Sequence, residues 1–296
     1  MSDDLIAAAK RRFTDLLPQS WRRDLTLVPV VRLSGAIGMN SPFRQSLTLA
    51  ATARLLDRAF AVKRAPAVAL VINSPGGSPV QSNLIFKRIR ALAEEKNKRV
   101  FAFVEDVAAS GGYMLACAAD EIYADPSSIV GSIGVVSAGF GFNDMLSRIG
   151  VERRVHTAGT RKVMLDPFQP ERAEDVDRLL AIQREVHASF RDLVRSRRGA
   201  LLRGEEDDLF SGEFWVGAQA LPMGLIDGLG DLRSVLRERF GTDVRTPLIA
   251  PSGNWFTRRA NGIGAQIGLD GGIGAGFAQG LADVAEERAL WARYGL

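Results

Sequence analysis

The chain has 296 residues, 46% of them hydrophobic and 24% charged, and its formal net charge is +4. This balance is that of an ordinary globular protein with enough residues for a large core, and it excludes a disordered chain. Cys117 is the single cysteine, so an internal disulfide is excluded. We interpret its thiol as a small buried hydrophobic group.

The charge and hydropathy patterns predict neither a nucleic-acid-binding surface nor a membrane span. Basic residues are interleaved with acidic ones, without a basic stripe that contains aromatic residues. No apolar run approaches the ~18 residues of a membrane span, and no apolar secretory signal is evident. We therefore expect a cytoplasmic protein. Residues 5–17 fit a short amphipathic helix, so peripheral contact with the inner membrane is the alternative.

Short apolar runs alternate with helical patterns through the first 240 residues. In chain order, the pattern predicts a strand at 25–33, a helix at 46–62, a strand at 67–72, a helix at 79–96 and a strand at 99–104. It continues with a helix at 113–119, strands at 121–124 and 131–136, a helix at 144–149, a strand at 151–157 and a long helix at 171–198. This alternation predicts an α/β fold with a mainly parallel, covered sheet.

Three segments of different composition divide the chain. Residues 1–24 are expected to form an N-terminal helical segment, residues 25–240 the main domain, and residues 241–296 a glycine-rich extension. The extension contains a glycine-rich apolar stretch at 261–280 and a predicted helix at 281–294. An apolar tail of this kind packs on a partner subunit or a membrane surface, or it folds back on its own domain, and the sequence leaves these alternatives open.

Two glycine-rich turns follow predicted strands, Asn73–Gly77 (NSPGG) and Ala109–Gly112 (ASGG). In an open parallel sheet both turns lie at the carboxyl edge, where ligands bind. Ser110 stands in the second turn, between a strand and an alanine-rich helix. Such a turn can expose a side chain beside free backbone N–H groups, which makes Ser110 a candidate nucleophile. The same residue types are also common in plain turns.

A serine nucleophile needs a base, and the sequence offers few. Of the two histidines, His187 lies within the long predicted helix and is interpreted as a surface or packing residue. His156 has no evident acidic partner. The other option is a lysine whose amine is kept uncharged by burial. Lys162 is the candidate because the apolar triplet Val163–Leu165 follows it.

Six segments, taken in order, carry a family resemblance. They are NSPGG at 73–77, ASGGY at 109–113, IYADP at 122–126, GSIGV at 131–135, GTRKVMLDP at 159–167 and EFWVGAQALPMGLID at 213–227. Over roughly residues 25–240 they resemble the signal peptide peptidase A family of Ser–Lys serine peptidases, in its short single-copy form. The resemblance implies a ββα superhelix of the Clp protease and crotonase type.

The resemblance also implies roles for single residues. Ser110 would be the nucleophile, Lys162 the general base, and Ser132 the hydroxyl that hydrogen-bonds and orients the lysine amine. The implied reaction is cleavage of signal-peptide remnants, or of other apolar or unfolded peptides, through an acyl-enzyme. It calls for no metal and no cofactor.

The backbone N–H groups of Gly77 and Gly111 would form the oxyanion hole, with Gly76 as the alternative to Gly77. Short family members resemble rings in which the serine and the lysine come from neighbouring subunits, so the implied partner is a second copy of the chain. The sequence departs from the family pattern at Asn73, where aspartate is frequent, and at Arg161, where tyrosine is frequent.

Two other functions fit parts of the pattern. A crotonase-like acyl-CoA enzyme would share the fold and the paired backbone N–H groups, and would use carboxylates such as Glu105 and Asp106 in place of a serine. A catalytically silent scaffold would bind membrane-protein partners through the glycine-rich tail. Labelling of Ser110 by a fluorophosphonate separates the peptidase from the crotonase.

Overall fold

The computed structural model describes residues 25–38, 46–159, 161–250 and 288–296. The predicted N-terminal helical segment at 1–24 and the glycine-rich stretch at 261–280 lie outside the described residues.

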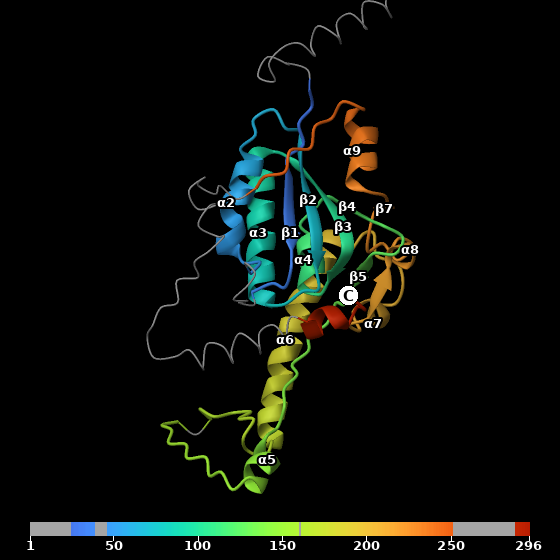
Figure 1. Ribbon diagram of the computed structural model, residues 1–296. Coiled ribbons are helices and arrows are strands. Elements are labelled where there is room, and N and C mark those ends of the chain that lie inside the picture. The colour runs from blue at the N-terminus through green and yellow to red at the C-terminus, as the bar shows by residue number, and fades with distance from the viewer. Residues whose placement is uncertain (1–24, 39–45, 160, 251–287) are drawn as a thin grey trace, which may run out of the picture.

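A mainly parallel sheet forms the centre of the protein (Figure 1). Within the described part of the chain it has seven strands. Its main path runs in the order β1 (Val30–Ser34), β2 (Ala67–Ser74), β3 (Arg99–Ala109), β4 (Glu121–Ala124) and β7 (Gly228–Leu229), with every neighbouring pair parallel. β5 (Ile129–Gly131) pairs in parallel with the end of β3, and β6 (Phe214–Val216) runs antiparallel to β5. The predicted α/β fold with a parallel sheet is confirmed.

The sheet is covered on both faces, which explains the continuous apolar runs of its central strands. Alternate residues of β2 belong to different hydrophobic core clusters, one on each face of the sheet. Val68 and Leu70 face one helical layer, and Ala69 faces the other. The first layer contains α2 (Leu49–Phe60), α3 (Pro79–Lys96) and α4 (Gly111–Ala116), and the second contains α9 (Leu232–Phe240) (Figure 1).

The long helix α6 (Ala173–Arg198) ends against α4 and extends away from the sheet at its other end (Figure 1). Two arginines fix the end of α4. Arg197 donates to the carbonyl oxygens of Cys117 and Ala119 at 3.0 and 2.9 Å, and Arg90 donates to that of Ala118 at 3.1 Å. Cationic donors at a helix C-terminus satisfy its last carbonyl groups and oppose its negative dipole. They thereby hold α4, which begins directly after Ser110.

Residues 137–159 and 161–170, which we call the arm, run out along the far half of α6 and return (Figure 1). The arm contains the short helix α5 (Asn143–Arg148) and a ring cluster of Phe140, Phe142 and Phe168. The predicted strand at 151–157 is wrong, because these residues lie in the arm without regular structure. The β-branched residues Val151, Val155 and Thr157 favour an extended conformation, but no described residue of the arm forms a strand with which they could pair.

The remaining elements are short, and one predicted strand is displaced. α7 (Glu206–Leu209) and α8 (Gly217–Ala220) are single turns near β6. The strand predicted at 131–136 is observed as β5, which ends at Gly131. It ends there because Ser132 has a φ of +52°, which no extended strand allows.

Asp231 caps α9, and its removal is expected to cost stability in a pH-dependent way. Its carboxylate accepts the backbone N–H groups of Ser234 and Arg233 at 3.0 and 2.7 Å, and the bond from Ser234 N–H lowers the pKa of this carboxyl. Asp231→Ala should lower the free energy of unfolding by about 1 kcal/mol at neutral pH. Because the pKa is depressed in the folded state, this stabilisation is present above about pH 4 and is lost as the pH falls.

Urea unfolding of the wild type and of Asp231→Ala at pH 7 and near pH 3 measures this difference. A difference in unfolding free energy of the same size at both pH values would show that the ionised carboxylate is not what stabilises α9.

Candidate active site

Ser110 connects β3 to α4 in an unusual backbone conformation, with φ of +52° and ψ of −120°. A non-glycine residue at such angles stores strain of about 1–3 kcal/mol, which the surroundings must balance. Its N–H donates to the carbonyl oxygen of Gly131 at 2.8 Å, and its own carbonyl accepts the N–H groups of Tyr113 and Met114 at 3.0 and 3.1 Å. The structure therefore places Ser110 on the strand-to-helix turn that the sequence predicts, with its side chain half-buried.

A cavity of about 810 Å³ opens beside Ser110. Its polar lining includes Ser110 and Ser132, which lie far apart in the sequence but are brought together because Ser110 follows β3 and Ser132 follows the neighbouring β5. Its apolar walls come from several elements and include Ile37, Val80, Met114, Val135, Val136, Phe190 and Leu290. A hydroxyl at the side of an apolar hollow suits a ligand that has both apolar side chains and a polar backbone.

Gly77 and Gly111 both line this cavity. Gly77 has a φ of +139°, and a Cβ atom there would lie 2.2 Å from the carbonyl oxygen of Ile37, so only glycine fits. Gly111 is the first residue of α4, where backbone N–H groups have no partner within the helix. The N–H of Gly76, in contrast, donates to the Ser74 hydroxyl at 3.3 Å. The geometry thus favours Gly77 over Gly76 as a donor to a bound ligand.

Ser132 is only 4% exposed and is fixed through backbone and side chain. Its N–H donates to the carbonyl oxygen of Glu213 at 2.6 Å. Its hydroxyl accepts a hydrogen bond from the hydroxyl of Tyr294 at 3.3 Å. In this chain the Ser132 hydroxyl is therefore bound to a tyrosine near the C-terminus.

Residues 288–296 form one wall of the cavity. Leu290 and Arg293 line it directly, and Tyr294 is buried against Val107 and Ala109 with its ring 5.1 Å from that of Phe214. The part of the predicted tail that the structure describes thus folds back on its own domain. The sequence contains little that would connect this segment with the site. The signal is limited to two aromatic residues, Trp291 and Tyr294, near the end of the sequence.

Lys162 is not near Ser110 within one chain. It is exposed in a turn of the arm at 161–165, and it is absent from the described lining of the Ser110 cavity. The arm leads away from the sheet, as Figure 1 shows. A Ser–Lys pair inside a single chain is therefore not formed in this structure, and the shared arrangement stays a prediction.

Neither histidine is among the described residues that line the Ser110 cavity. His156 is exposed in the arm. His187 is half-buried on α6, where its Nε2 atom lies 2.9 Å from the carbonyl oxygen of Ile133, so the interpretation as a packing residue is confirmed. Cys117 is also confirmed as a buried group. It is fully buried, and desolvation raises the pKa of its thiol to about 12.

The carboxylates beside the turn are bound away from the cavity. Glu105 forms an ion pair with Arg32, and Asp106 accepts a hydrogen bond from the Asn73 side-chain amide at 2.6 Å. Asn73 also accepts the N–H of Val107 at 3.3 Å, so it joins the end of β2 to β3. An aspartate at position 73 would repel Asp106, which explains why asparagine suits this chain. Neither carboxylate lines the Ser110 cavity, as a crotonase mechanism would require.

Comparison with known proteins identifies the family. Residues 92–240 match the model of peptidase family S49. The chain belongs to this family. A putative protease of Methanocaldococcus jannaschii is 30% identical over 215 residues, which are 72% of the S49 chain and 68% of that protein. A chloroplastic serine protease of Arabidopsis thaliana is 31% identical over 213 residues, which are 69% of this chain and 31% of that one. The predicted kinship with serine peptidases is confirmed.

A further relative carries a different name. A Brucella abortus protein named Na(+)/H(+) antiporter NhaA is 59% identical over 284 residues, which are 95% of the S49 chain. The S49 chain spans only 38% of the length of that relative. None of the helices among the described residues is both long and apolar enough to cross a membrane.

Proposed function

We propose that the S49 chain is a serine endopeptidase in which Ser110 of one subunit works with Lys162 of another. The observation that carries the proposal is the placement of Ser110. The strained turn presents its hydroxyl to an apolar cavity, next to the backbone N–H groups of Gly77 and Gly111. Membership of a peptidase family agrees with this arrangement.

In the proposed reaction the Ser110 hydroxyl attacks the peptide carbonyl carbon. Lys162, in its uncharged form, accepts the hydroxyl proton and passes it to the leaving amine. The N–H groups of Gly77 and Gly111 stabilise the oxyanion of the tetrahedral intermediate, and water then hydrolyses the acyl-enzyme. Ser132 would orient the lysine amine. In that case the lysine amine hydrogen-bonds to the Ser132 hydroxyl, either in place of the Tyr294 hydroxyl or in addition to it.

The arm is the part of the chain suited to supply the lysine to a neighbour. It carries exposed apolar side chains, among them Phe140 at 82%, Ile149 at 61% and Val151 at 50% exposure. A globular protein rarely leaves several such groups together in water, so a second copy of the chain is a fitting cover. Burial in that contact would also remove Lys162 from solvent, as a base requires.

The substrate and the organisation of the chain complete the proposal. The apolar cavity walls fit signal-peptide remnants or other apolar, unfolded peptides. Residues 25–240 form the peptidase domain, which we assign to the ββα superhelix of the Clp protease and crotonase type. Residues 241–296 form an extension, and within it residues 288–296 complete the cavity wall. We place the protein in the cytoplasm, with peripheral contact at the inner membrane.

Activity-based labelling tests the proposal. Wild type, Ser110→Ala and Ser189→Ala are treated with a fluorophosphonate, and peptide turnover is measured in parallel. Ser189 is the matched control because its exposed side chain lines the same cavity from α6. Ser110→Ala should lose the label and at least about 10⁴-fold of its turnover, whereas Ser189→Ala should resemble the wild type. Equal labelling of Ser110→Ala would refute the nucleophile, and full biological activity of that variant would favour a scaffold.

A further inference from the structure

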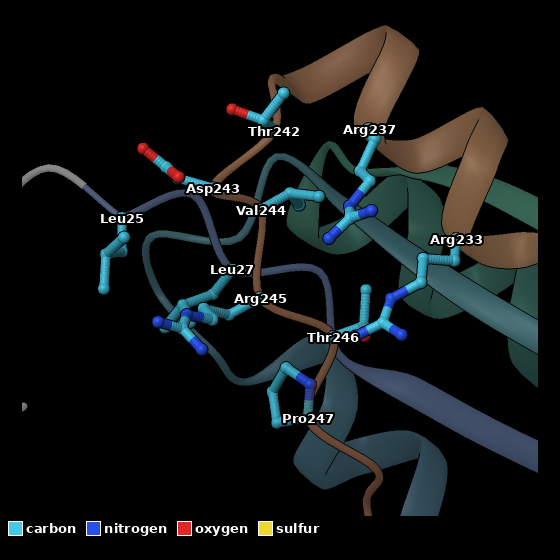
Figure 2. A pocket seen from close by; sticks show the side chains of 10 residues that line it. All are labelled: Leu25, Leu27, Arg233, Arg237, Thr242, Asp243, Val244, Arg245, Thr246 and Pro247. Carbon is cyan, nitrogen blue, oxygen red and sulfur yellow. The ribbon is translucent and has the colours of Figure 1, made fainter.

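A second hollow lies at the edge of the sheet opposite Ser110 (Figure 2). It has a volume of about 700 Å³ and lies between α9, the residues that lead into β1, and residues 242–247. This last segment is joined to the start of β1, where Val28 and Val30 donate to the carbonyl oxygens of Arg245 and Pro247 at 2.8 and 2.9 Å. Because Ser110 follows the carboxyl end of a parallel strand, the hollow at the amino edge is a separate site.

The lining of this hollow is strongly basic. It includes Arg233, Arg237 and Arg245 but, within the described part of the chain, only one acidic residue, Asp243. Arg233 and Arg237 lie one turn apart on α9, and Figure 2 shows both side chains extending from the helix toward Val244 and Thr246. The structure therefore directs two positive charges into one space.

Neither Arg233 nor Arg237 forms an ion pair with any described residue, and this includes Asp243 in the same hollow. Arg239 on the same helix shows the contrast, because it binds Glu121 at 2.6 Å and the Tyr123 hydroxyl at 3.1 Å. Two neighbouring guanidinium groups repel each other unless an anion lies between them. Their planar N–H donors match the oxygens of a phosphate group, which can accept from both at once.

We propose that the hollow binds a phosphate group between Arg233 and Arg237, with the Thr246 hydroxyl as a further donor. The apolar side chains of Leu25 and Leu27 line the same hollow and would contact any non-polar part attached to the phosphate. Free phosphate and the headgroup of an anionic lipid share this chemistry. The proposal does not depend on the peptidase activity, and its tests measure binding alone.

Variants must separate a built site from general attraction, because the whole chain has a net charge of +4. Arg233→Gln with Arg237→Gln removes the two charges from the hollow. Arg178→Gln with Arg184→Gln is the matched control, since it removes two exposed charges from α6. Arg233→Lys with Arg237→Lys keeps the charges but loses the planar donors. All four arginines are exposed, so the fold should be retained, and circular dichroism checks this.

Two probes are applied to the full chain. Inorganic phosphate is titrated at constant ionic strength while the thermal unfolding midpoint is recorded, because a ligand of the native state raises that midpoint. Sedimentation with phosphatidylcholine vesicles, with and without phosphatidylglycerol, measures lipid binding. We expect the wild type and the α6 control to respond to at least one probe. The double variants Arg233→Gln/Arg237→Gln and Arg233→Lys/Arg237→Lys should both bind that probe at least about tenfold more weakly.

The outcomes are distinct. A phosphate-dependent midpoint without vesicle binding identifies free phosphate as the source, and binding to phosphatidylglycerol vesicles identifies the lipid headgroup. The proposal is overturned if the wild type and Arg233→Gln/Arg237→Gln respond equally, or if the wild type responds to neither probe. Full binding by Arg233→Lys/Arg237→Lys also overturns the proposal, because positive charge alone would then explain the binding.

Discussion

A mixture of two inactive variants of the S49 chain, Ser110→Ala and Lys162→Ala, is expected to regain activity. Each variant alone should be inactive, because one lacks the proposed nucleophile and the other lacks the proposed base. The loss of a general base typically costs about 10²–10⁴-fold in rate. If the two groups come from different subunits, an interface can combine an intact Ser110 with an intact Lys162. In a random equal mixture about one quarter of the interfaces have both, so about one quarter of wild-type turnover is expected.

The structural reason lies in the arm. Lys162 is exposed there and does not line the cavity of its own chain, so the proposal pairs this lysine with the serine of another copy. The measurement is peptide turnover after dissociation and reassembly of the mixed subunits. A mixture of Ser110→Ala with the double variant Ser110→Ala/Lys162→Ala has no intact serine and is the control. If labelled subunits exchange but the first mixture stays inactive, the shared dyad is wrong.

Gly77→Ala is expected to lower kcat by about 10²–10³-fold, the usual cost of losing one oxyanion donor. The new Cβ would lie 2.2 Å from the carbonyl oxygen of Ile37, so the backbone has to move, and this shifts the Gly77 N–H from its place beside the Ser110 cavity. If this N–H stabilises the charge that develops during the reaction, as proposed, kcat should fall more than KM rises.

Gly35→Ala is a matched control for this variant. Gly35 also has a positive φ, +103°, but its added Cβ would meet nothing within 4 Å. Both variants carry backbone strain, so thermal unfolding should show a loss of stability in each. Only Gly77→Ala should lose turnover in addition to stability. Similar kinetic losses in the two variants would mean that strain, and not a lost donor, explains the effect.

Those parts of the fold whose signals are local could be predicted from the sequence. Helix α3 begins and ends where predicted because Ser78 caps it and Pro79 fits its first position. β3, in contrast, extends five residues beyond the prediction, to Ala109. Glu105 and Asp106 interrupt its apolar run, and only the structure shows that Arg32 and Asn73 bind these carboxylates and let the strand continue.

The candidate site likewise combines features that local sequence signals predict with features that they do not predict. The Ser110 turn could be predicted because a strand, two glycines and a helix are adjacent in the sequence. The contact of Tyr294 with Ser132 could not, since it joins residues 162 positions apart and depends on how the end of the chain packs. Local patterns also could not predict that Lys162 lies exposed in the arm, because the course of the arm depends on tertiary packing.

The burial of Cys117 has a practical consequence for studies of assembly. Its thiol is inaccessible and remains protonated at neutral pH, so it should not react with maleimides in the native protein. No other cysteine occurs in the chain. A cysteine introduced at an exposed arm position would therefore carry a spin or fluorescent label at one defined place, without any background substitution. Such a label would report directly whether the arm becomes immobilised against a second copy.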